Sequence, residues 1–97
     1  SYPNDKLAGN AQYWLGEVFY AQKDYKNAAI SFAGGYQKYK DNPKAADSLF
    51  KLGMSMLGLN KKDEACSAFT NLAAEFPAAS EELKNRAKDE ASKLECK

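Results

Sequence analysis

Histidine is absent from this 97-residue chain, and with it the commonest general base and the commonest metal ligand of proteins. Its absence also excludes every nucleophile that depends on a Ser–His or Cys–His pair. The two cysteines alone cannot supply the four ligands of a structural zinc site. We therefore expect a chain that is not an enzyme and that uses no metal or other cofactor.

The chain also lacks an excess of charge of either sign, because 14 Lys and Arg side chains balance 13 Asp and Glu side chains. A nucleic-acid binder or a polybasic membrane segment would concentrate positive charge. No apolar run approaches the ~18–20 residues of a transmembrane helix. We therefore expect neither nucleic-acid binding nor membrane insertion. The chain begins at Ser1 with neither Met nor an apolar leader, so we expect a mature fragment or an expressed domain, and its length predicts one domain, residues 1–97.

β-Branched residues are scarce, since the chain has one Val, one Ile and one Thr, whereas Ala and Lys are abundant. Proline occurs only at positions 3, 43 and 77, and these positions leave long uninterrupted segments. Both features are typical of helices, so we expect an all-α fold.

The sequence repeats when it is shifted by 37 residues. The positions that match in size and polarity are Ala8 with Ala45, Tyr13 with Phe50, Leu15-Gly16 with Leu52-Gly53, Phe19 with Met56, Ala28 with Ala65, and Phe32 with Phe69. The matches are separated by helical spacings. They predict two repeats, residues 5–40 and 43–77, each with two helices.

Helix boundaries follow from capping residues and prolines. We expect Asn4 or Asp5 to begin the first helix, Asp24 the second, Asn60 the fourth and Ser80 a fifth. Pro43 is expected in the first turn of the third helix. The apolar stripe expected to be buried on the first helix consists of Ala8, Ala11, Leu15, Val18 and Phe19.

Gly16 and Gly53 occupy equivalent positions inside predicted helices, where Gly costs about 1 kcal/mol relative to Ala. The recurrence of this cost at equivalent positions indicates that a Cβ atom would collide with a partner helix. Gly35 is expected to have a packing role, whereas Gly34 is not.

Both repeats share a Leu-Gly pair, an aromatic residue or Met three positions after the Gly, and an Ala and a Phe four residues apart. This set resembles the tetratricopeptide repeat (TPR). The resemblance implies a TPR-type right-handed superhelix of two helix-turn-helix repeats followed by a C-terminal capping helix, residues 81–96. The spacing of 37 exceeds the usual 34 residues and places the additional residues in the connection near 39–44.

Longer strings narrow the resemblance: N-A-Q-Y-W-L-G-E at 10–17, D-Y-K-N-A at 24–28 and P-K-A-A-D-S-L-F-K-L-G at 43–53. They are similar to the C-terminal TPR domain of the Tol–Pal-associated periplasmic family known as YbgF or CpoB. This resemblance implies a periplasmic protein that binds TolA and coordinates peptidoglycan synthesis with outer-membrane constriction during cell division. It also implies a trimer formed by a coiled coil outside this chain, and we expect the isolated chain to be monomeric.

Two other functions stay open. One is a general TPR adaptor, such as an outer-membrane assembly lipoprotein. The other is an accessory domain that contacts peptidoglycan, for which Tyr13, Trp14 and Glu17 offer aromatic and carboxylate groups.

In a TPR stack the first helices line a concave face on which a partner segment lies. By the repeat register, the residues expected there are Asn10, Tyr13, Trp14, Glu17 and Tyr20 from the first repeat and Asp47, Phe50, Lys51, Met54 and Leu57 from the second. Aromatic side chains on such a face are strong anchors for a partner. A structural alternative stays open, in which Tyr13 and Phe50 close the gap between helix pairs and Trp14 packs on the preceding chain.

Cys66 is expected early in the fourth helix and Cys96 at the end of the fifth. If adjacent helices pack antiparallel, the start of one lies near the end of the next, and the two sulfur atoms meet. A disulfide between them would agree with an oxidising periplasm. Two buried free thiols are the alternative.

Overall fold

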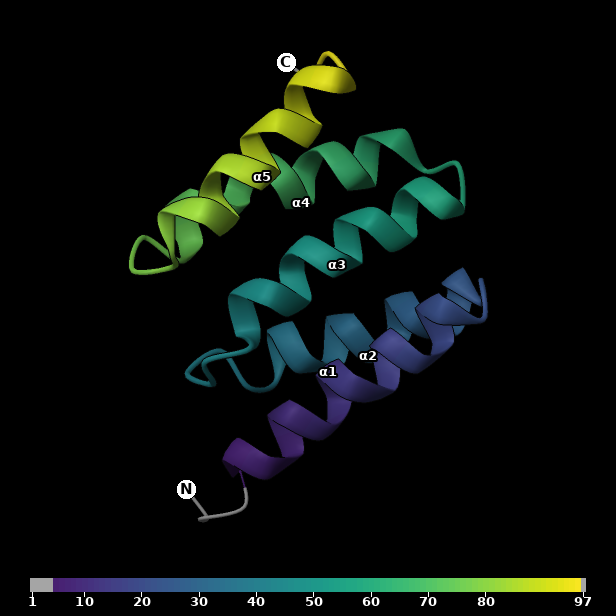
Figure 1. Cartoon of the computed structure of the whole chain (residues 1–97), viewed down its shortest axis with the longest axis vertical. Coiled ribbons are helices and arrows are strands. Elements are labelled where there is room, and N and C mark those ends of the chain that lie inside the picture. Colours follow the sequence, from purple (N-terminus) through teal and green to yellow (C-terminus); the bar gives the residue numbers. More distant parts are fainter. Residues whose placement is uncertain (1–4, 97) are drawn as a thin grey trace.

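Two antiparallel helical hairpins and a terminal helix form the molecule (Figure 1). The structure is a computed structural model that describes residues 5–96, with side chains from residue 7 onward. The helices are α1 (Asp5–Ala21), α2 (Tyr25–Gln37), α3 (Ala45–Gly58), α4 (Lys62–Glu75) and α5 (Glu81–Lys93). No strand occurs among the described residues, and the expected all-α fold is confirmed.

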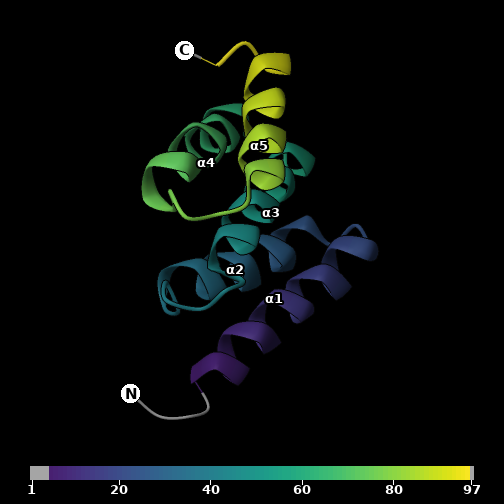
Figure 2. The ribbon, with the colours of Figure 1, turned by 60° about the vertical axis from the view of Figure 1, so that its left-hand side comes forward.

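The helices lie in two layers. The first helix of each hairpin and the terminal helix are neighbours, because α3 contacts both α1 and α5. The backbones of α2 and α4 do not come within 8 Å of each other in the described part of the chain, although each packs on α3 (Figure 2). The shortest dimension of the molecule, 18 Å, matches two layers of helices, since one helix with its side chains is about 10 Å wide. None of the described helices is long and apolar enough to cross a membrane.

The predicted repeat is visible as one packing arrangement that occurs twice. In the first hairpin the rings of Tyr13 and Phe32 lie 5.8 Å apart at 59°. In the second, the equivalent rings of Phe50 and Phe69 lie 5.5 Å apart at 54°. Each pair packs with a fully buried alanine of the second helix, Ala28 or Ala65.

The expected role of the two mid-helix glycines is confirmed. A Cβ atom built on Gly16 would lie 2.6 Å from the ring of Phe32, and one built on Gly53 would lie 2.6 Å from the ring of Phe69. Real Cβ atoms do not approach other atoms this closely, so each ring occupies the space that the glycine leaves. Gly35 is also tightly packed, against Ser48, whereas a Cβ atom at Gly34 would make ordinary contacts.

Two of the predicted helix caps form. The Asp24 carboxylate accepts a hydrogen bond from the Asn27 backbone N–H at 3.3 Å, and the Ser80 hydroxyl accepts one from the Leu83 backbone N–H at 3.1 Å. Asn4 lies outside the described residues.

The other two boundary predictions are wrong in detail. Asn60 does not cap α4, because its φ of 62° places it in the turn and Lys61 holds the N-cap position without a side-chain hydrogen bond. Pro43 lies before Lys44, the N-cap residue of α3, and so precedes the first turn of that helix.

Three helices end in the same way, with a non-glycine residue in the left-handed region: Lys23, Asn60 and Glu95. The next residue then donates its backbone N–H to a carbonyl five residues earlier, the bond of a Schellman motif. These bonds run from Asp24 to Phe19 at 2.9 Å, from Lys61 to Met56 at 2.8 Å and from Cys96 to Ala91 at 2.9 Å.

The predicted buried stripe of α1 is partly wrong. Leu15 and Val18 are 44% and 53% exposed, and Ala11 is exposed as well. Phe19, by contrast, packs against the buried cluster of the first hairpin, formed by Tyr13, Ala28 and Phe32. The position equivalent to Ala11 is Ser48 of α3, which is buried against α2. The described residues place no helix on the corresponding side of α1, so its apolar stripe faces outward.

The structure joins Cys66 of α4 to Cys96, just after α5, in a disulfide with the Cα atoms 5.6 Å apart. The Schellman turn after α5 directs the chain to this position. The bond ties the terminal helix to the second hairpin.

We predict opposite effects for two Gly→Ala substitutions. Gly53→Ala lowers the free energy of unfolding by about 1–2 kcal/mol, because overpacking against the buried Phe69 ring outweighs the gain in helix propensity. Gly34→Ala is the matched control and raises it by about 0.5–1 kcal/mol, since its new methyl group meets no obstruction. Urea unfolding followed by circular dichroism measures both, and equal effects of the same sign would contradict the packing role of Gly53.

We also predict that Cys96→Ser lowers the free energy of unfolding by about 3–4 kcal/mol, because the disulfide closes a 30-residue loop in the unfolded chain. Reductant should shift the wild-type urea midpoint to that of the variant. The double variant Cys66→Ser/Cys96→Ser should not respond to reductant. Two alkylatable thiols in protein purified without reductant from an oxidising compartment would show that the bond does not form.

Candidate functional site

The surface shared by α1, α3 and α5, called the first-helix surface below, carries most of the residues predicted to bind a partner. An ion pair between Glu17 of α1 and Lys51 of α3, with 3.4 Å between Oε1 and Nζ, bridges its first two helices. Both side chains are less than one-third exposed, so the pair is a fixed part of this surface.

Tyr13 links this surface to the core. Its ring is 8% exposed and packs on Phe32, while its hydroxyl donates a hydrogen bond of 3.3 Å to Oε2 of Glu17. Burial raises the pKa of Tyr13 to about 12, and the negative charges of Glu17 and Asp47 add to the increase. The hydroxyl therefore stays protonated and continues to donate to Glu17 at any physiological pH.

Trp14, the neighbour of Tyr13, points outward. Its ring is 57% exposed and meets the ring of Tyr13 edge to face, with centroids 5.2 Å apart. The Lys44 ammonium lies 5.1 Å from the centre of the Tyr13 ring and 5.7 Å from that of the Trp14 ring. These contacts give an accessible aromatic ring with a cation beside it.

Tyr20 makes a second site of this kind nearly two turns further along α1. Its ring meets Tyr25 edge to face at 5.4 Å, and the Lys51 ammonium lies 5.0 Å from its centre. Burial raises the pKa of Tyr20, with smaller contributions from Tyr25, Glu17 and Glu90.

Phe50 is a core residue, only 2% exposed, and packs on Phe69. The guanidinium group of Arg86, from α5, covers its ring at 4.6 Å. Phe50 and Tyr13 thus have the structural contacts of the alternative interpretation, whereas Trp14 and Tyr20 retain accessible ring surface.

The remaining predicted residues, Asn10, Asp47, Met54 and Leu57, are each partly exposed. Met54 and Leu57 also pack against the larger core, the cluster of buried residues from α3, α4 and α5, so part of each side chain is structural.

Sequence reasoning missed the cations that accompany the rings. Lys44 was not predicted here because it lies in the turn before α3, and Arg86 because the charge pattern of α5 predicts a solvated helix. Lys93, 72% exposed, pairs with Glu90 as that pattern predicts, whereas Lys84, which pairs with Glu81, is only 19% exposed. Only the crossing of α5 over α3 brings Arg86 to Phe50.

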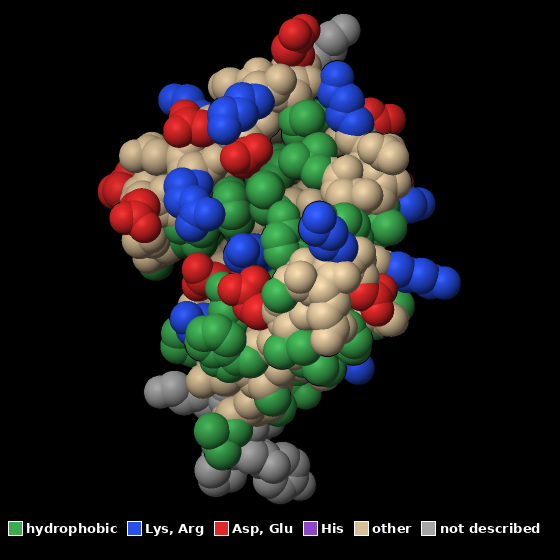
Figure 3. Space-filling model, turned by 45° about the vertical axis from the view of Figure 1, so that its right-hand side comes forward, with side chains coloured by type: hydrophobic (Ala, Val, Ile, Leu, Met, Phe, Trp, Pro, Cys, Tyr) green, Lys and Arg blue, Asp and Glu red, His purple; other side chains and the backbone are tan. Residues whose placement is uncertain are grey.

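Hydrophobic side chains are visible both near the end of the molecule formed by α1 and α2 and in a band through the middle of the view, with charges of both signs on either side of that band (Figure 3). No group of three potential metal ligands comes together within residues 5–96. The first-helix surface therefore offers aromatic rings, cations and hydrogen-bonding groups to a ligand.

Two segments of the chain, residues 10–42 and 47–79, match the sequence model of the tetratricopeptide repeat family. No curated protein sequence matches the chain. The two matched segments correspond to the two hairpins. Together they include the aromatic residues and glycines that repeat at an interval of 37 residues.

We predict that the two adjacent aromatic residues of α1 differ in their contribution to stability. Tyr13→Ala lowers the free energy of unfolding by about 3 kcal/mol because it empties a core site. Trp14→Ala lowers it by about 1 kcal/mol or less, since the exposed ring loses only an edge contact with Tyr13 and the neighbouring Lys44 ammonium. Thermal and urea unfolding test both, and a large loss in Trp14→Ala would mean that this ring is structural and not free to bind.

Proposed function

Because the chain belongs to the tetratricopeptide repeat family, we propose that it is a non-catalytic protein-interaction module whose partner binds the first-helix surface. The proposal rests on one observation above all: this surface has accessible Trp14 and Tyr20 rings, each with a lysine held beside it. Aromatic side chains such as Trp and Tyr dominate the binding energy of protein interfaces.

The contacts on this surface indicate what the partner should offer. The exposed face of Trp14 favours an apolar or aromatic side chain, and the Lys44 ammonium beside it favours a carboxylate or a backbone carbonyl. Lys51 is already paired with Glu17, so it positions the Tyr20 ring more than it attracts charge. We therefore expect a segment that combines apolar and acidic residues.

We further propose that the module acts in the periplasm as part of a Tol–Pal-linked protein. In this role it would bind TolA and help to coordinate peptidoglycan synthesis with outer-membrane constriction during cell division. The support is the similarity of residues 10–17, 24–28 and 43–53 to that family, together with a disulfide that suits an oxidising compartment. The isolated chain would be monomeric, and trimerisation would depend on a coiled coil elsewhere in the protein.

The experiment that tests this function is a calorimetric titration of the chain with purified TolA. We predict saturable binding that weakens about tenfold or more in Trp14→Ala and in Tyr20→Ala, because each removes an anchor ring. The matched control is Ile30→Ser, an exposed apolar residue of α2 outside the first-helix surface, which should bind as the wild type does.

Other outcomes would identify a different function. No heat of binding to TolA, with recovery of a β-barrel assembly protein from envelope extract, would favour a general adaptor. Sedimentation of the chain with purified sacculi, abolished by Trp14→Ala, would favour a peptidoglycan-contacting domain. Equal binding of TolA by all three variants would contradict the use of the first-helix surface.

A further inference from the structure

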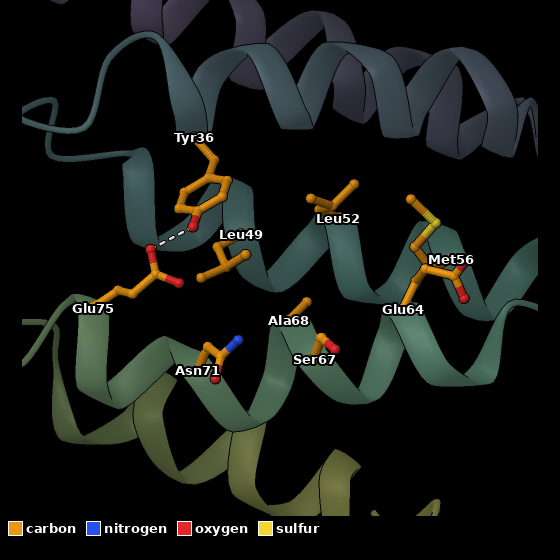
Figure 4. A pocket seen from close by; sticks show the side chains of 9 residues that line it. All are labelled: Tyr36, Leu49, Leu52, Met56, Glu64, Ser67, Ala68, Asn71 and Glu75. Carbon is orange, nitrogen blue, oxygen red and sulfur yellow. Dashed lines mark hydrogen bonds between the residues drawn. The ribbon is translucent and has the colours of Figure 1, made fainter.

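A groove of about 280 Å³ separates α2 from α4, and its floor is α3 (Figure 4). None of the described side chains of α1 or α5 lines it, so it is distinct from the first-helix surface. The groove exists because α2 and α4 each pack on α3 without approaching each other.

The groove has an apolar floor and an acidic rim. Leu49, Leu52 and Met56 of α3 form the floor, and Glu64 and Glu75 of α4 lie toward its two ends (Figure 4). The two glutamates are eleven residues apart on one helix, which places them about 16 Å from each other along its axis. Among the side chains that the structure describes, no lysine or arginine lines the groove.

Both carboxylates can accept a ligand's cation. Neither forms an ion pair within the described part of the chain. The Tyr36 hydroxyl donates a hydrogen bond to Oε1 of Glu75 across one end of the groove, which leaves Oε2 available. The ammonium group of Lys40 lies near the same end of the groove, 5.6 Å from the centre of the Tyr36 ring.

We propose that the α2–α4 groove binds an extended peptide segment of another protein in which an apolar residue lies between two basic ones, spaced as Lys/Arg-x-apolar-x-Lys/Arg. In extended backbone these three side chains point to the same side, and the basic residues are about 13 Å apart. Their flexible side chains then reach Glu64 and Glu75 while the apolar residue contacts Leu52.

An extended segment fits this groove better than a helix does. The Tyr36–Glu75 hydrogen bond joins α2 to α4 and narrows one end, whereas a helix with side chains is about 10 Å wide. A volume of about 280 Å³ accommodates a few side chains and not a whole helix. Binding in this groove is independent of the proposed function, because the ligand would lie between α2 and α4 and not on α1 and α5.

The test is a titration of the isotope-labelled chain with the capped heptapeptide Ser-Lys-Ser-Leu-Ser-Lys-Ser, followed by amide chemical shifts. We predict saturable shifts at Ser67, Ala68 and Asn71, which line the groove. Glu64→Gln and Glu75→Gln should each weaken binding about two- to fivefold, the range of an exposed ion pair, and added salt should weaken it as well. The peptide with Glu in place of both Lys should not bind.

Two further variants make the result specific. Glu82→Gln, which removes an exposed carboxylate of α5 away from the groove, should leave the affinity unchanged. Ser67→Arg should abolish binding without lowering the melting temperature, because it fills the groove from an exposed position. Absence of saturable shifts, or shifts confined to α1 and α5, would overturn the proposal. Groove shifts that appear on raising the concentration of the chain alone would identify a second copy as the occupant and would also overturn it.

Discussion

The packing of one phenylalanine ring into the space left by one glycine sets the geometry of each hairpin. Phe32 lies where a side chain at Gly16 would be, and Phe69 does the same at Gly53. A larger residue at either glycine would separate the helices, and a smaller one at either phenylalanine would leave a cavity. Because both residues repeat at an interval of 37 residues, the two hairpins share one internal geometry, and they stack through the contact of α2 with α3.

This stacking gives the molecule two different faces. The first helices and α5 lie close together, so side chains from successive helices meet, as Glu17 and Lys51 do, and Arg86 covers Phe50. The second helices diverge, and the space between them is bridged at one end by Tyr36 and Glu75. One face therefore presents rings and cations, whereas the other is an apolar groove with an acidic rim.

Repetition made much of this fold predictable from sequence. Matched pairs such as Phe32 with Phe69 predicted two hairpins that pack alike, whereas Tyr13 and Phe50, predicted first as partner-binding residues, are buried in the core. The outward stripe of α1 was not predictable, because periodicity identifies an apolar face without showing whether another helix covers it. Asn60 was misassigned because its side chain suits both a cap and a left-handed turn. The position of Arg86 depends on how α5 crosses α3, which one-dimensional patterns do not contain.

The terminal helix has a larger part in the site than its polar composition predicts. Its last turn ends in a Schellman motif that places Cys96 next to Cys66, and the disulfide between them fixes the end of α5 against α4. Leu83 and Ala87 anchor the same helix in the larger core. Held at both places, α5 keeps Arg86 over Phe50 and completes the first-helix surface. If a partner binds the first-helix surface as proposed, stability and binding are coupled through this helix, because a loosened α5 would remove a cation from the surface while leaving the rings of α1 in place.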